Sequence, residues 1–175
     1  TGTAELASSD AGVLNLSKNE RGRYFVDVVF KPGPRGTLDY GSILDSSAEF
    51  QAAFTRVDGT LVNLTFAGSP KPVTLLVDSN GIPQESIVTA PSADELVTKV
   101  ENLGVQKFRY EITTSGFVWS TGILKVDFLA GAWTQKMSDG SVGIGNVSSS
   151  RIIRVEGATA ATANPVNGSD ISVGV

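Results

Sequence analysis

The stretch RYFVDVVF, residues 23–30, is the strongest strand signal in the chain. Alternate residues from Tyr24 to Phe30 are apolar and fall on one face, because successive side chains of a strand point to opposite faces. Asp27 lies on the other face among apolar neighbours, which favours a buried, paired carboxylate. The following KPGPRG, residues 31–36, ends the strand because proline cannot donate to a β ladder. We therefore expect a core strand here.

The rest of the chain repeats this pattern in short pieces. Asp58-Gly59 is a strong hairpin signal, and Ser79-Asn80-Gly81 and the glycine-rich residues 138–146 are typical of turns. The other predicted strands are VLNLSK (13–18), AEFQAAFTRV (48–57), LVNLTF (61–66), PVTLLVD (72–78), VQKFRYEIT (105–113), ILKVDFLAG (123–131), AWTQKM (132–137), SSRIIRVEG (149–157) and DISVGV (170–175). Residues 38–50 are irregular and allow one helical turn.

One segment, PSADELVTKVENLG (residues 91–104), predicts a helix. Ser92 is a good N-cap with Glu95 three residues on, and Gly104 stands where a C-terminal glycine belongs. Short strands separated by turns, with a single helix, predict an all-β fold. We expect an antiparallel Ig-like β-sandwich with one short inserted helix at about residues 92–103.

Composition narrows the function classes. The 175 residues are 41% hydrophobic and 18% charged, with a net charge of −4 and neither cysteine nor histidine. Thiolate and imidazole chemistry are therefore excluded, and an acidic chain does not suit a nucleic-acid partner. The basic residues Lys18, Arg21 and Arg23 are interpreted as solvated charges around a turn. No apolar run approaches the roughly 20 residues of a transmembrane helix, so we expect a chain that does not span a membrane.

The two ends of the chain resemble each other. Thr3-Ala4 matches Thr159-Ala160, and apolar alternation follows in both places. This favours residues 158–175 as the start of a second copy of the module. We therefore divide the chain into an arm or linker (1–10), an Ig-like sandwich (11–157), and a linker with a terminal strand (158–175). The only methionine is Met137, so we expect a processed chain or a piece of a longer one.

Four stretches carry a family resemblance: residues 23–50 (RYFVDVVFKPGPRGTLDYGSILDSSAEF), 104–117 (GVQKFRYEITTSGF), 126–146 (VDFLAGAWTQKMSDGSVGIGN) and 154–168 (RVEGATAATANPVNG). They resemble the tandem Ig-like modules of large secreted bacterial adhesins and of RTX-type or surface-layer-like proteins. The resemblance implies a non-catalytic extracellular or cell-surface module, whose partners are neighbouring copies or modules of the same protein. The acidic glycine-rich nonapeptides that bind calcium in RTX blocks are missing, so that calcium binding is not carried over.

Carboxylates are the remaining candidates for a metal site. Calcium needs six to eight oxygens from several segments, and the chain has no DxDxDG run. Asp10 and Asp170 lie in the linker-like ends, where calcium between modules would bind, and are our calcium candidates. The other acidic residues considered are Asp39, Asp45, Glu49, Asp127 and Asp139, for which ordinary turn and edge positions are the favoured interpretation, and Asp27, whose place within a strand points instead to burial and pairing.

The terminal strand suggests an interface. Its apolar face would remain uncovered at the end of the chain, and such a strand recruits partners by strand addition. The expected interface residues are Val13, Leu14, Leu16, Ile171, Val173 and Val175. Two alternatives stay open: a subunit of a self-assembling filament or sheath joined by terminal strand exchange, and a head that binds surface glycans. For a sugar platform Trp119 is the exposed candidate, whereas Trp133 is expected in the core.

Overall fold

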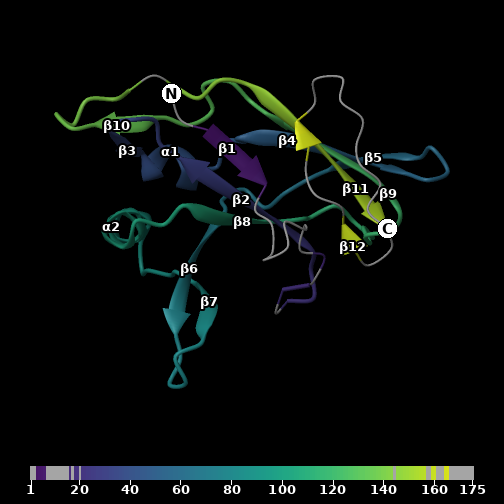
Figure 1. The fold of residues 1–175 in the computed structure, drawn as a ribbon, viewed down its shortest axis with the longest axis horizontal. Helices are drawn as coiled ribbons and strands as arrows, with labels where there is room; N and C mark the ends of the chain where they lie inside the picture. The colour runs from purple at the N-terminus through teal and green to yellow at the C-terminus, as the bar shows by residue number, and fades with distance from the viewer. Residues whose placement is uncertain are drawn as a thin grey trace.

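The computed structural model of the protein describes residues 3–6, 16, 18–19, 21–143, 145–156, 159–160 and 164–165. Antiparallel strands dominate the described part, and two helices accompany them (Figure 1). The strands are β1 Thr3–Leu6, β2 Phe25–Lys31, β3 Gly36–Leu38, β4 Phe50–Arg56, β5 Leu61–Leu64, β6 Lys71–Val77, β7 Pro83–Ile87, β8 Lys107–Glu111, β9 Gly122–Phe128, β10 Gln135–Met137, β11 Ser149–Glu156, β12 Thr159–Ala160 and β13 Asn164–Pro165. The helices are α1 Tyr40–Leu44 and α2 Ala93–Leu103.

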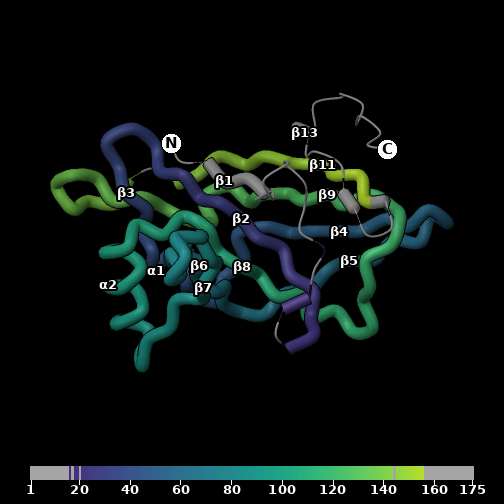
Figure 2. Tube along the Cα trace, turned by 60° about the horizontal axis from the view of Figure 1, so that its bottom comes forward, coloured from purple at the N-terminus to yellow at the C-terminus, as the bar shows by residue number. Residues whose placement is uncertain are grey.

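Two antiparallel sheets form the sandwich. The first sheet has the order β1-β2-β8-β6-β7, and the second has the order β12-β11-β9-β4-β5, with β13 also paired to β11. Figure 2 shows β11, β9 and β4 running side by side in one layer and β2 and β8 in the other. The short pair β10-β3 and the two helices gather at one end. The predicted all-β antiparallel sandwich with a short helix is confirmed.

Strand β2 forms where the alternation predicts it. Its inner side chains Val26, Val28 and Phe30 are fully buried in the core. On its outer face Phe25 and Asp27 are also buried, so the strand is covered on both sides. It pairs with β8 on one edge and with β1 on the other, which makes it a central strand of the first sheet.

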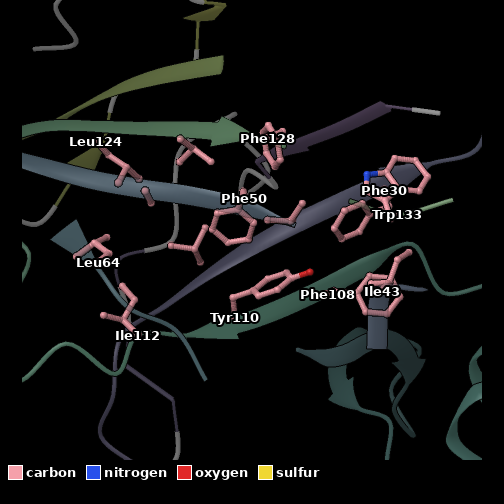
Figure 3. Close-up of a cluster of buried hydrophobic side chains, with 14 of the residues drawn as sticks. Phe30, Ile43, Phe50, Leu64, Phe108, Tyr110, Ile112, Leu124, Phe128 and Trp133 are labelled. Carbon is pink, nitrogen blue, oxygen red and sulfur yellow. The ribbon is translucent and has the colours of Figure 1, made fainter. Parts of the chain in front are cut away.

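Aromatic rings fill the space between the sheets (Figure 3). Trp133 is 1% exposed and lies edge-on to Phe30 with ring centroids 5.2 Å apart, so its predicted core position is confirmed. The expectation of an exposed Trp119 was wrong. That side chain is 7% exposed, and its ring centroid lies 5.6 Å from that of Phe54 and 4.9 Å from that of Phe117. Flanking glycines indicate a loop, but this loop folds its large ring back over the end of β4.

Helix α2 has both predicted caps. The Ser92 hydroxyl accepts a hydrogen bond from the backbone N–H of Glu95 at 3.2 Å, and Gly104 adopts a left-handed φ of 64°. Val100 is fully buried and anchors the helix to the core. Neither helix in the described part of the chain is long and apolar enough to cross a bilayer.

The hairpin turns also follow the sequence. The turn at Asp58-Gly59 joins β4 to β5, with Gly59 at a φ of 89°. The turn at residues 79–81 joins β6 to a strand that we did not predict, β7. The sequence of β7, PQESI, alternates no apolar residues and starts with proline, so it gives no strand signal by itself.

The matching chain ends lie at the edges of different sheets. Thr3–Leu6, within the stretch expected as an arm, pairs with β2 at the edge of the first sheet. Thr159–Ala160, within the C-terminal segment, pairs with β11 at the edge of the second sheet. Both Thr-Ala pairs are therefore edge-strand residues.

Candidate functional site

Most sequence-predicted site residues lie outside the described residues. The exception is Leu16, which is partly buried and packs against the core. The others are Asp10 and Asp170 for calcium, and Val13, Leu14, Ile171, Val173 and Val175 for the interface. Calcium binding and terminal strand exchange therefore stay predictions.

The other acidic candidates are scattered, and each has its own contacts. Asp39 accepts a hydrogen bond from the Thr134 hydroxyl at 2.8 Å, and Asp45 accepts one from the backbone N–H of Ser47 at 2.8 Å. Asp127 and Asp139 each accept a hydrogen bond from a nearby serine hydroxyl. Within the described ranges, no three acidic side chains come together to hold a metal ion. The turn-and-edge interpretation does not hold for Asp127, because it lies in β9 between β4 and β11.

Asp27 belongs to a charge network on the outer face of the first sheet. It is 4% exposed and receives two hydrogen bonds from the Arg109 guanidinium, at 2.8 and 2.9 Å. Arg109 also bonds Glu85 of β7 at 3.0 Å, and Lys107 bridges Glu85 and Asp27. The Arg109 guanidinium lies 3.9 Å from the Phe25 ring centroid. The network ties β2, β8 and β7 together, and the expectation of a buried, paired Asp27 is confirmed.

The basic turn before β2 is less solvated than we expected. Arg21 and Arg23 are about half exposed, yet both pair with the buried Glu111 carboxylate at 3.3 and 3.1 Å. Asn19 donates a third bond to the same carboxylate at 2.6 Å. The three contacts lower the pKa of Glu111 below its ordinary value, against the opposing effect of burial. These charges fix the turn to the end of β8.

A second buried carboxyl has no cation beside it among the described residues. Glu49, at the start of β4, is 1% exposed and accepts a hydrogen bond from the Tyr110 hydroxyl of β8 at 2.8 Å. Its other oxygen, Oε1, has no hydrogen-bond partner among the described residues. Burial raises the pKa of Glu49 to about 8, although the bond from Tyr110 opposes the rise. The carboxyl is therefore mainly protonated at neutral pH, and the pair joins the two sheets without a full charge.

A cleft of about 560 Å³ opens beside this pair. It forms because β4 and β5 separate beyond their last pair, Ala52 and Leu64. The β4 chain stays in the second sheet, where Phe50 pairs with Phe128. The chain after β5 crosses to the first sheet, where Phe66 bridges to Ile112. The cleft thus lies at the seam where the chain passes between the sheets.

The β6–β7 hairpin extends outside the sandwich, pointing downward in Figure 1. Strand β6 pairs with β8 only over Lys71–Val73, so the rest of the hairpin has no neighbouring strand in the described structure. Its large apolar side chains are more than half exposed; we call Leu75, Leu76, Val77 and Ile82 the hairpin patch. Asp78 accepts from the backbone N–H groups of Asn80 and Ile82 at 2.8 and 2.9 Å, which orders the tip.

A second exposed apolar surface lies on the outer face of the other sheet. Leu61, Thr55, Ile123 and Arg154 stand opposite one another across β5, β4, β9 and β11. Leu61 and Ile123 are exposed, as is the nearby Val57; we call these three residues the sheet patch. A hollow of about 230 Å³ lies beside it, lined by residues 55–57, 121–123 and 154.

Comparisons with known proteins do not identify the chain. No family model, no curated protein and no solved structure matches it. The adhesin and surface-layer resemblance therefore stays an expectation. The cleft and the two apolar patches are the described features that bear on function.

Sequence reasoning missed the cleft and the hairpin patch for separate reasons. Glu49 was considered only as a calcium ligand, because its partner Tyr110 is 61 residues away and carries no motif. The apolar run of β6 was a visible signal, but it equally suits a buried strand. Only the short pairing of β6 with β8 places its distal half outside the sandwich.

Proposed function

We propose that the chain is a non-catalytic, extracellular Ig-like module of a bacterial surface adhesin or array, which supplies length and contacts between modules. The observation that carries the proposal is the β6–β7 hairpin. Leu75 and Val77 lie on one face of it and Leu76 on the other, and all three side chains are more than half exposed. Exposed apolar clusters of this kind mark surfaces of contact, because their burial releases about 25 cal/mol per Å².

The hairpin is ordered before it meets a partner. Its base is fixed by ion pairs from Glu85 to Lys107 and Arg109, and by a backbone bond from Val88 to Pro72 at 2.9 Å. Its tip is ordered by the Asp78 carboxylate. A preorganised element loses little conformational entropy when it binds, so more of the burial energy appears as affinity.

We further propose that the sheet patch of the next copy receives the hairpin patch. The two patches lie on different sheets, and Figure 1 places the hairpin and the β4–β5 turn at different ends of the molecule. A contact between unlike patches repeats head to tail, and it continues as an open array when the rotation between copies does not close a ring. Charge also matches, because Asp78 flanks the hairpin patch whereas Arg56 lines the hollow at the sheet patch. Charges of opposite sign favour this pairing over one between two hairpins.

Sedimentation velocity over a concentration series tests the contact. The expected result is a concentration-dependent rise in sedimentation coefficient for the wild type that is absent in Leu75→Glu. Thr98→Glu, an equivalent change on the exposed face of α2, is the control and is expected to behave like the wild type. A monomeric wild type at millimolar concentration, or equal association of all three proteins, would contradict the proposal.

Terminal strand exchange remains a second prediction. It uses Val13, Leu14 and residues 171–175, which lie outside the described residues. Deletion of residues 165–175 separates it from the hairpin contact. Association lost on deletion and kept in Leu75→Glu would favour strand exchange.

A further inference from the structure

The cleft beside Glu49 has the size and lining of a small-molecule site. Its volume of about 560 Å³ lies within the 300–1,000 Å³ of ordinary ligand pockets. One wall is aromatic: the ring centroid of Phe50 lies 4.9 Å from that of Phe66 and 4.8 Å from that of Tyr110. Phe66 is the partly exposed ring of the three, so it offers its surface to a ligand.

The described lining of the cleft also includes residues with uncharged polar side chains: Ser46, Ser47, Gln51, Asn63 and Thr65. Both amides are exposed, and neither side chain makes a hydrogen bond to the described part of the chain. Each amide is therefore available to donate hydrogen bonds to a ligand and to accept hydrogen bonds from it.

Glu49 supplies the remaining polar group. Its Oε2 accepts from Tyr110, and both residues line the cleft. Oε1 is buried and has no hydrogen-bond partner among the described residues. An unsatisfied buried oxygen costs free energy until it is paired. Oε1 is fully enclosed, so a ligand hydroxyl pairs with it only after a shift of the Glu49 side chain. Because this carboxyl is mainly protonated at neutral pH, the cleft holds no full charge.

We infer that this cleft binds a neutral saccharide unit, such as the end of a glycan chain. The aromatic wall suits the C–H face of a sugar ring, and the amides and hydroxyls suit its hydroxyl groups. An uncharged lining does not compensate a carboxylate or an ammonium group, so charged sugars are disfavoured. The site is separate from the hairpin and sheet patches and does not depend on association between copies.

The test is an NMR titration of the ¹⁵N-labelled chain. The neutral probes are the methyl glycosides of glucose, galactose and mannose, together with N-acetylglucosamine; glucuronate and glucosamine are the charged comparators. The side-chain amide signals of Gln51 and Asn63 are identified by their loss in Gln51→Ala and Asn63→Ala. We expect at least one neutral probe to shift both signals saturably, and the charged sugars to bind at least tenfold more weakly.

The variants decide whether the shifts report binding in the cleft. Loss of two hydrogen bonds in the double variant Gln51→Ala/Asn63→Ala should weaken binding about tenfold. Gln106→Ala removes an exposed amide outside the cleft and should leave affinity unchanged. The inference is overturned if no neutral probe produces saturable shifts, if charged sugars bind equally well, or if the double variant binds like the wild type. Thermal melts of each variant establish that the fold is kept.

Discussion

The buried Glu49 carboxyl should make the stability of the fold fall between pH 5 and pH 8. Burial raises the pKa of Glu49 from its ordinary value of 4.5 to about 8, so the folded chain keeps this proton through an interval in which the unfolded chain releases it. Stability is therefore highest below the unfolded pKa and is lost as the pH rises toward the folded pKa. Glu49→Gln keeps the size of the side chain and removes the titration.

The magnitude follows from the difference between the two pKa values. Each pH unit within the interval removes at most about 1.4 kcal/mol of unfolding free energy, and the whole range between the two pKa values removes on the order of 4 to 5 kcal/mol. The groups that face Glu49 do not offset this loss. Tyr110 stays protonated because burial and the nearby Glu49 raise its pKa, and Asp45 raises the pKa of Glu49 further.

The absence of histidine makes this interval easy to interpret. Several carboxyls have a pKa below the ordinary value, so they are already ionised at pH 5: Asp58, Asp78, Glu85, Glu111 and Asp139. Their contributions to stability are present above their unfolded pKa and are lost only in stronger acid. Glu49 is thus the side chain expected to dominate the slope above pH 5.

Urea unfolding followed by tryptophan fluorescence from pH 5 to pH 9 measures the effect. The wild type should lose stability up to about pH 8 and then level off, whereas Glu49→Gln should be nearly flat. Glu85→Gln is the matched control: it removes a carboxylate that is charged throughout, so it should lower the curve without changing its slope. A flat wild-type profile, or a Glu49→Gln profile with the wild-type slope, would refute the reasoning.

Three further substitutions test the packing. Phe30→Ala should cost about 3–5 kcal/mol of unfolding free energy in urea titrations, because the ring is fully buried; an unchanged midpoint would place it outside the core. Arg109→Ala should cost about 3–5 kcal/mol, because it removes both hydrogen bonds to the buried Asp27 carboxylate and leaves Lys107, 3.8 Å away, as its described cation; a loss below about 1 kcal/mol, measured the same way, would mean that Lys107 or water replaces Arg109. Gly122→Ala should reduce the free energy of unfolding by about 1–3 kcal/mol or more and lower the melting temperature, because its Cβ would lie 2.2 Å from the Thr55 carbonyl oxygen. A wild-type melting temperature would contradict that close approach.

The sequence predicts those parts of the fold that depend on local chemistry. Ser92 and Gly104 cap α2 because capping is decided within a few residues. The same holds for the turn at Asp58-Gly59, and for the burial of alternate residues in β2. Each of these signals lies within one short segment, so it does not depend on contacts with distant parts of the chain.

The candidate surfaces could not be predicted because they depend on how distant segments meet. Glu49 and Tyr110 come together only when β4 and β8 face each other across the sandwich. The cleft opens because Phe66 pairs with the other sheet, which no local pattern indicates. Leu75 is exposed because β8 begins at Lys107, opposite Val73, so the rest of β6 extends past the first sheet.

The contact between the hairpin patch and the sheet patch can be tested directly by disulfide crosslinking, because the chain has no cysteine of its own. Val77→Cys in the hairpin patch and Ile123→Cys in the sheet patch are purified separately, mixed and mildly oxidised. Thr98→Cys on α2 replaces either partner as the control. We predict that the Val77→Cys/Ile123→Cys heterodimer forms faster than any pairing that involves Thr98→Cys. Equal rates in all mixtures, or dimers of Val77→Cys alone, would contradict head-to-tail contact between modules.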